Sequence, residues 1–179
     1  MIDPPTIVID QQEKIPFTFE RLPTVTEKLR TGDYSIKGLE HKVGIERKEL
    51  GDLLGCIPNQ PGKRLRFKRE IMDLVGKPFH MLIIEATLPM IERRINYCRH
   101  CNGTGELFSN LVGQTQCHVC GGQRTVSWRS KVHPNAVLGT LTSWQARFGL
   151  RIIFGGTHAQ CGRYVEQSLE KAFEEFVER

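Results

Sequence analysis

The sequence has no apolar run long enough to cross a membrane. The longest apolar run is Met81 to Ile84, which lies shortly after Phe79. A membrane-spanning helix needs about 20 apolar residues. The first 20 residues lack the basic start and apolar stretch of a secretory signal. Aromatic residues are few, at 8% of the 179 residues, but hydrophobic residues reach 39%, which is enough for a packed core. We therefore expect a folded intracellular protein, in the cytoplasm, nucleoid or nucleus, with no membrane partner.

The chain also has no excess of acidic residues over basic ones. Lys and Arg number 25 against 20 Asp and Glu, a formal net charge of +5. The basic residues gather at 42–69 and 88–132, while 163–179 is acidic. Such clustering favours a polyanionic partner, although a charge run is often only a solvated helix face. The candidate residues for contacting such a polyanion are Lys63, Arg64, Arg66, Arg99, Arg124 and Arg129.

Hydrophobic periodicity predicts alternating strands and helices. Short β-branched or apolar runs predict strands at 6–10, 25–29, 34–36, 43–48, 79–86 and 151–154. The strand at 79–86 is apolar almost throughout, so we expect it in the middle of a sheet that is covered on both faces. Helical spacing predicts helices at 50–57, between the break at 58–62 and Gly76, between Pro134 and Gly149, and after the capping box of Thr157 and Gln160. This order predicts an α/β domain with a mixed central sheet, interrupted by a module at about 90–132.

Two predicted strand ends carry acidic and basic side chains. Asp33 belongs to the string Gly32-Asp33-Tyr34, and alternation along the next strand puts Glu46 and Lys48 on one face. If the intervening hairpin brings Asp33 alongside, two carboxylates and an ammonium converge. Carboxylates bind Mg²⁺ or Mn²⁺, and a lysine can orient an attacking water or offset negative charge. The sequence thus offers candidates for metal-dependent phosphodiester hydrolysis. The alternative is a solvated strand in which Glu46 pairs with Arg47 or Lys48.

These sequence motifs resemble those of a known family. The residues that carry the resemblance are Ile7 to Glu13, Gly32 to Tyr34, Ile45 to Lys48 and Asp52 to Leu54. They closely resemble the nuclease domain of the XPF family of structure-specific endonucleases, which belongs to the PD-(D/E)xK superfamily. The likeness continues through 63–67, 82–85 and from 151 onward. It implies a restriction-endonuclease-like fold, with a nuclease domain at 1–89 and 133–179.

The resemblance also implies an activity. It implies an endonuclease dependent on Mg²⁺ (or Mn²⁺) that acts on DNA, branched or flapped, in repair or recombination, and that forms a homodimer. Asp33 and Glu46 would ligate the metal, and Lys48 would act on the attacking water. The other implied site residues are Asp10 as a further acid, Arg47 and Asp52 as supports, and Glu13 at the edge of the site.

Two features depart from the family. Gln12 stands where the family usually has Arg, which removes one cation near the site. The family's tandem helix-hairpin-helix domain is not among these 179 residues, so we expect DNA geometry to be recognised elsewhere. The alternative function is a non-catalytic DNA-binding or protein-adaptor module on a nuclease-like fold. The presence of Asp33, Glu46 and Lys48 favours the enzyme.

Four of the six cysteines form two Cys-x₂-Cys pairs. Fifteen residues separate Cys98 and Cys101 from Cys117 and Cys120. This spacing predicts a closed, structural Zn²⁺ site with four thiolate ligands. The segment 90–132 is similar to the zinc repeats of DnaJ-type chaperones, with only two repeats present. Two disulfides are the alternative, which the expected compartment disfavours.

Several side chains near these pairs have more than one interpretation. We expect His100 and His118 to be exposed neighbours of the zinc site, and Cys56 to be a buried thiol like Cys161. The arginines of the module, together with Tyr97 and Trp128, could grip phosphates and stack an unpaired base. A protein-binding surface, as in DnaJ-type modules, is the other interpretation.

Overall fold

Six strands form one mixed sheet. The computed structural model describes residues 4–57, 61–109, 113–128 and 130–177. The strand order is β10-β5-β4-β3-β1-β2. The strands are β1 (Ile7–Asp10), β2 (Thr24–Glu27), β3 (Tyr34–Ile36), β4 (Val43–Glu49), β5 (Phe79–Glu85) and β10 (Ile152–Phe154). β4, β5 and β10 are parallel, β3 is antiparallel to both of its neighbours, and β2 is parallel to β1. The predicted α/β fold with a mixed central sheet is confirmed.

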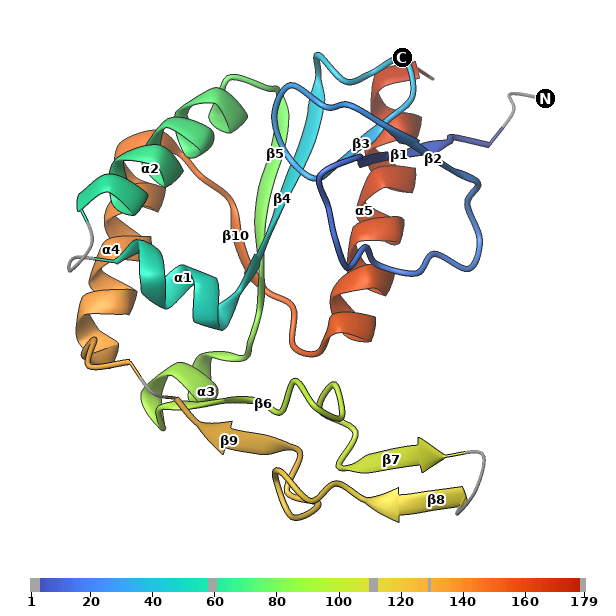
Figure 1. Cartoon of the computed structure of the whole chain (residues 1–179). Coiled ribbons are helices and arrows are strands. Elements are labelled where there is room, and N and C mark those ends of the chain that lie inside the picture. Colours follow the sequence, from blue (N-terminus) through green and yellow to red (C-terminus); the bar gives the residue numbers. More distant parts are fainter. Residues whose placement is uncertain (1–3, 58–60, 110–112, 129, 178–179) are drawn as a thin grey trace.

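Helices cover both faces of this sheet (Figure 1). The helices α1 (Leu50–Cys56), α2 (Pro61–Val75) and α4 (Pro134–Phe148) pack on one face, and α5 (His158–Val177) packs on the other. Along β5, Leu82 and Ile84 join the core under α1, α2 and α4, whereas Met81 and Ile83 join the core under α5. All four side chains are buried. The expectation of a central strand covered on both faces is therefore confirmed.

The same alternation divides the polar end of β4. Val43 and Ile45 lie in the core under α5. Because side chains alternate along a strand, Arg47 points to that face, and Glu46 and Lys48 point to the face that carries α1 and α2. The contacts agree, since Arg47 lies over the ring of Phe17 in the α5 core and Lys48 lies over the ring of Phe67 in α2.

The helix ends follow the sequence signals. Pro134 is the first residue of α4, and Gly149 closes that helix in the left-handed conformation at φ +66°. At the start of α5, the Thr157 amide donates to Gln160 Oε1 at 2.9 Å, and the Gln160 amide donates to Thr157 Oγ1 at 3.3 Å. This reciprocal pair is the predicted capping box.

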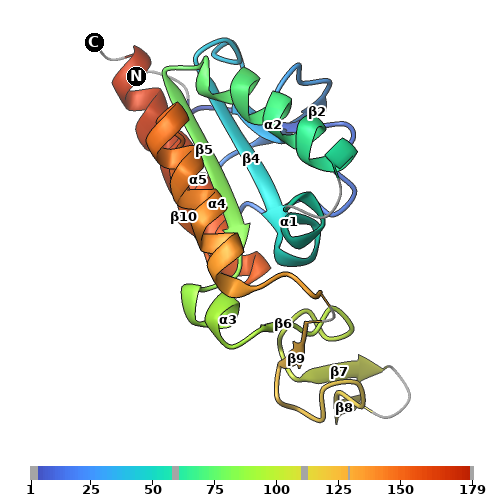
Figure 2. The ribbon, with the colours of Figure 1, turned by 90° about the vertical axis from the view of Figure 1, so that its left-hand side faces the viewer.

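Between α3 (Leu88–Glu92) and α4, the chain leaves the central sheet. It forms two small antiparallel sheets, one of β6 (Ile95–Tyr97) with β9 (Thr125–Ser127) and one of β7 (Glu106–Ser109) with β8 (Gly113–Gln116). Figures 1 and 2 show this segment at one end of the sheet, opposite the C-terminal end of α5. The sequence did not predict α3 or these strands, because these short segments carry little apolar patterning. The strands β6 to β9 also flank four cysteines, not a hydrophobic core that would impose such a pattern. The boundaries of the module at 90 and 132 stay a prediction.

Across the described ranges, no helix combines the length and the apolar character that crossing a bilayer requires.

Candidate active site and metal centre

A glycine turn delivers the first acid to β4. Gly32 has φ +85°, and a Cβ at this position would lie 3.0 Å from the carbonyl oxygen of Ile45. This close approach lets the Asp33 amide donate to the Ile45 oxygen at 2.8 Å. The Asp33 Oδ2 atom in turn accepts a hydrogen bond from the Arg47 amide at 2.7 Å. The hairpin therefore brings Asp33 to the strand segment that carries Glu46 and Lys48.

Glu46 and Lys48 lie together on the α2 side of β4. Lys48 Nζ donates to Glu46 Oε1 at 2.9 Å and lies 4.2 Å from the centre of the Phe67 ring. The two side chains are 13% and 16% exposed, so they are not a solvated surface pair. Although burial opposes it, the Glu46 carboxylate raises the pKa of Lys48, which keeps the lysine protonated. The expectation that the two residues share a face is confirmed.

The two acids are difficult to ionise together. Burial, and then the charge of Glu46, raises the pKa of Asp33 to about 8. Burial is also the main cause that raises the pKa of Glu46. A divalent cation would stabilise both groups as carboxylates, because it supplies the missing positive charge. Their oxygens are the hard ligands that Mg²⁺ and Mn²⁺ prefer, so this pair of residues fits such an ion.

Asp10 lies beside the pair but is occupied by backbone amides. Its own amide donates to the Asp33 carbonyl oxygen at 2.8 Å. Its Oδ1 atom accepts from the Leu29 amide at 2.8 Å, and its Oδ2 atom accepts from the Gln12 amide at 3.1 Å. The carboxylate thus ties the chain just after β1, at Gln12, to the chain just after β2, at Leu29. A role for Asp10 as a further metal acid stays a prediction.

Arg47 binds three carboxylates on the opposite face of the sheet. Its Nη1 atom lies 3.1 Å from Glu13 Oε1, its Nη2 atom lies 3.1 Å from Glu49 Oε1, and its Nε atom donates to Glu85 Oε1. The Arg47 side chain is 9% exposed, and a charge this buried needs partners of opposite sign. The backbone amide of Arg47 therefore positions Asp33, and the Arg47 side chain is fixed by Glu13 and the two other acids.

The sequence interpretation missed three members of this network: Glu49, Glu85 and His158. Glu49 and Glu85 are partners in the parallel register of β4 and β5, so each ends its strand at the same edge. His158 Nδ1 lies 3.0 Å from Glu85 Oε1. Although burial opposes it, hydrogen bonds from His158 and Arg47 hold the pKa of Glu85 below its ordinary value. The sequence did carry one signal for Glu49 and Glu85, because each is an acidic residue at the end of a predicted strand.

A cleft with a volume of about 1030 Å³ lies over this site. Its wall includes all seven residues proposed for catalysis: Asp10, Glu13, Asp33, Glu46, Arg47, Lys48 and Asp52. Asp52 borders the cleft from the first turn of α1 and is exposed. Exposed cations also line it: Lys14, Lys28, Arg30, Lys63 and Arg66. The site therefore combines buried acids with a basic rim suited to a polyanion.

The predicted DNA-binding residues separate into groups. Lys63 and Arg66 line the cleft, whereas Arg64 is exposed on α2 outside the cleft wall. Arg99 of the module bonds Glu49 at the end of β4. Arg124 is exposed on the far part of the module, and Arg129 lies outside the described residues. The structure therefore brings Lys63, Arg66 and Arg99 near the acids.

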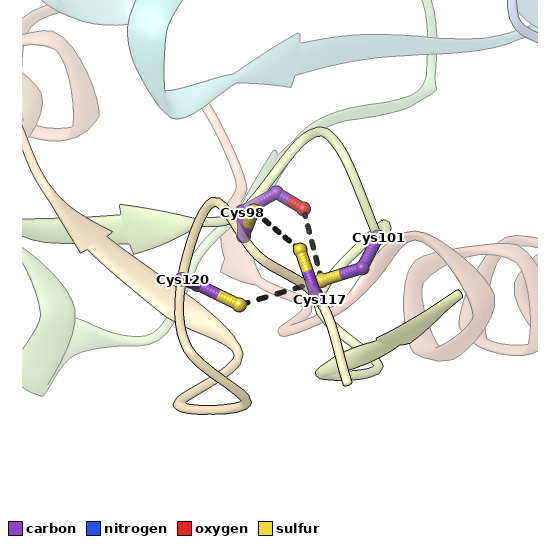
Figure 3. A group of neighbouring side chains, drawn as sticks. All are labelled: Cys98, Cys101, Cys117 and Cys120. Atoms are coloured by element: carbon purple, nitrogen blue, oxygen red, sulfur yellow. Dashed lines mark hydrogen bonds between the residues drawn. The ribbon is translucent and has the colours of Figure 1, made fainter. Parts of the chain in front are cut away.

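The four cysteines of the module converge (Figure 3). Their Sγ atoms all lie within 4.8 Å of one another. The Cys98 and Cys117 sulfurs are 3.9 Å apart, and those of Cys101 and Cys120 are 3.7 Å apart. Four sulfurs bound at about 2.3 Å to a tetrahedral Zn²⁺ would be separated by about 3.8 Å, so this cluster fits zinc. All six cysteines are free thiols, which removes the disulfide alternative.

The surroundings of the cluster agree with a closed site. The Gly105 amide donates to Cys101 Sγ at 3.3 Å. His100 and His118 are exposed and contact each other, with ring centroids 4.5 Å apart, outside the group of sulfurs. Of the two lone cysteines, Cys161 is buried as expected. Cys56 is half-buried and borders the cleft, so the expectation of a buried thiol is wrong there, because its helix lies at the cleft wall.

A mixed sheet of this order with helices on both faces is a nuclease-type fold. A family model, the ERCC4 domain, matches residues 9–168. The chain belongs to the ERCC4 domain family.

Two solved structures share this fold. One is XPF from Aeropyrum pernix, with a TM-score of 0.58 and 12% sequence identity over 94% of this chain and 61% of that chain. The other is XPF from Aeropyrum pernix in complex with DNA, with a TM-score of 0.55 and 13% identity over 96% of this chain and 66% of that chain. The chain thus spans slightly less than two thirds of the length of these relatives. A comparison with curated protein sequences finds no match.

The sulfur geometry predicts one zinc ion per chain. Replacing Cys117 with Ser removes one thiolate from a four-sulfur site, so the Cys117→Ser variant should lose bound zinc and melt at a lower temperature. Elemental analysis and thermal unfolding measure both effects. Cys56→Ser is the matched control, because Cys56 lies outside the cluster, and it should keep one zinc ion. Zinc retained at parental stoichiometry in Cys117→Ser would refute the assignment.

The buried acid pair predicts a pH-dependent stability difference. Because the Asp33 pKa is raised from 3.8 to about 8, the folded state holds a proton that the unfolded state releases, and stability falls as pH rises between these values. In the Asp33→Asn variant, residue 33 does not ionise, so this loss of stability with rising pH should disappear. The Asn side-chain oxygen can still accept the hydrogen bond from the Arg47 amide. Without added divalent metal at pH 8, the melting temperature of this variant should exceed that of the parent by at least about 2 °C. The difference should shrink toward pH 4, and a constant difference across this range would contradict it.

Proposed function

We propose that the protein is a metal-dependent endonuclease that hydrolyses phosphodiester bonds in DNA, with branched or flapped DNA as its substrate. One observation carries the proposal: Asp33 and Glu46 are buried with raised pKa values beside Lys48, on the wall of a cleft rimmed by cations. The solved XPF structure in complex with DNA supports DNA as the ligand. The same proposal includes a homodimer, an intracellular setting, and a zinc module that aids substrate binding.

The proposed metal site uses the two buried acids. Asp33 and Glu46 would hold Mg²⁺ or Mn²⁺, with Asp10 alongside. When bound, such an ion lowers the pKa of a water ligand and polarises a phosphoryl oxygen.

The chain's own residues bind the substrate and stabilise charge. Lys28, Arg30, Lys63 and Arg66 contact the phosphate backbone from the rim, because they are exposed cations on the cleft wall. Lys48 stays protonated beside Glu46, so it acts as a hydrogen-bond donor that orients the attacking water and offsets negative charge, not as a base. The Arg47 amide keeps Asp33 in place.

Cleavage assays test this proposal. With Mg²⁺ or Mn²⁺, the parent should cut flap, fork or junction DNA, and chelation of the metal should stop it. Asp33→Ala and Lys48→Ala should each lower the rate at least about 100-fold, the usual effect of removing a group that stabilises transition-state charge. DNA affinity should change little, and Glu92→Ala, an exposed acid outside the cleft, should cut at the parental rate. An Asp33→Ala variant as active as the parent would exclude the proposed site. A parent that binds DNA but cuts none of these substrates would favour the non-catalytic alternative.

The rim cations predict a change in salt dependence. Each phosphate contact contributes about 0.9 to the slope of log affinity against log salt concentration. The double substitution Lys28→Ala with Arg30→Ala should therefore flatten this slope by about 1 to 2, as measured by fluorescence anisotropy at several salt concentrations. Arg163→Ala, an exposed cation on α5 on the other face of the sheet, is the control. Equal slopes in the parent and the double variant would show that the cleft rim does not bind DNA.

A further inference from the structure

A second cavity lies between α1 and the zinc module. Its volume is about 610 Å³, which is in the range of sites that hold small organic groups. Leu54 of α1 and Ile57, which directly follows that helix, form one side, and Tyr97, Val126 and Trp128 of the module form the other. We call this cavity the α1–module groove. It is distinct from the catalytic cleft, and neither the acids nor the zinc site explains it.

Trp128 gives the groove an aromatic face and an unused donor. Its indole Nε1 atom is buried and has no hydrogen-bond partner among the described residues. Buried donors normally have a partner, and an indole N–H usually finds one. A planar ligand could stack on the part of the Trp128 side chain that lines the groove. A nucleobase is such a ligand.

The charge of the groove suits a nucleic acid. Lys131 and Arg99, which also pairs with Glu49, line it as exposed cations, His100 lies beside them, and none of its described lining residues is acidic. An exposed apolar peptide would use the aromatic wall but would not require this cationic edge. A nucleotide uses both, because its base is planar and its phosphate is anionic.

Two glycines connect the groove with the catalytic cleft. Gly51 and Gly55, one turn apart on α1, line both cavities. A Cβ at Gly55 would meet no atom within 4 Å. At Gly51, a Cβ would lie 3.2 Å from an Arg99 guanidinium nitrogen. The open passage between the two cavities is therefore at Gly55, where a nucleic-acid chain can cross bare helix backbone.

We propose that the α1–module groove binds an unpaired nucleotide of the strand whose adjoining phosphate lies in the catalytic cleft, with its base against Trp128 and Tyr97. This inference rests on the proposed function. It adds to that function a specific binding site for an unpaired nucleotide next to the phosphate that is cut. It also gives the zinc module a specific task, which is to close one side of a base-binding groove.

A steric block tests the proposal. Gly55→Leu places a side chain where the two cavities meet, and the open space there lets the helix keep its fold. Gly139→Leu is the matched control, because Gly139 is also helical and free of atoms within 4 Å of a Cβ, and it lies on α4 away from both cavities. The zinc-loaded proteins are titrated with a labelled oligothymidylate of about 12 nucleotides and with a blunt duplex, with Ca²⁺ in place of Mg²⁺. Gly55→Leu should lose single-strand affinity at least about fivefold, as expected for one lost stacked base. Its loss of affinity for the blunt duplex should be smaller, because a fully paired duplex offers no unpaired base to the groove. Gly139→Leu should match the parent in both.

Tryptophan fluorescence gives a second readout. The chain has two tryptophans, and Trp144 is buried against Phe67 in the core, so Trp128 is the one that reports on the groove. The oligonucleotide should quench the parent, and a Trp128→Phe variant should show no quenching.

Two results would overturn the proposal: equal single-strand affinities for Gly55→Leu and the parent, or quenching by an apolar peptide but not by the oligonucleotide. Cleavage assays on the same preparations separate the two hypotheses. If the parent cuts DNA while Gly55→Leu binds single strands normally, the groove inference fails alone. If no DNA is cut but the block still weakens single-strand binding, the proposed catalysis fails alone.

Discussion

The hydrogen bond from the Arg47 amide to the Asp33 carboxylate determines the geometry of the site. Arg47 lies between Glu46 and Lys48 on β4, so an acid held at its amide necessarily lies close to both. The bond can form because Gly32 has no side chain and so lets the turn lie close to β4. A Cβ at this position would be only 3.0 Å from the Ile45 carbonyl oxygen. A side chain at position 32 would push the turn away from β4, and the two acids would no longer share one site.

The two faces of the sheet differ in how their acids are partnered. On the α5 face, the Arg47 guanidinium binds Glu13, Glu49 and Glu85, with His158 as a further partner of Glu85. On the α2 face, Lys48 is the ion-pair partner of Glu46, and Asp33 is a buried acid with a strongly raised pKa. A nearby cation would favour the ionised form of such an acid. Glu49 also joins the faces to the module, since it binds Arg47 through one oxygen and Arg99 through the other.

The features that depend on local patterning could be predicted from the sequence. Strand alternation was enough to place Glu46 beside Lys48, residue spacing was enough to bring Cys98, Cys101, Cys117 and Cys120 together, and capping residues marked the ends of α4 and α5. The remaining features depend on tertiary register. The partners of Arg47 follow from the parallel alignment of β4 with β5. The hydrogen bond from the Leu29 amide to Asp10 follows from the parallel pairing of β1 with β2. The α1–module groove follows from how the module docks, which no periodicity in the sequence encodes.

The central claim is that Asp33 and Glu46 share one divalent metal ion. The most direct measurement is anomalous diffraction from crystals soaked in Mn²⁺. The geometry described here predicts a peak within about 2.1–2.3 Å of a carboxylate oxygen of each residue, as expected for a small hard cation. Manganese bound elsewhere in the cleft, or an unoccupied Asp33–Glu46 pair at saturating Mn²⁺, would contradict the claim.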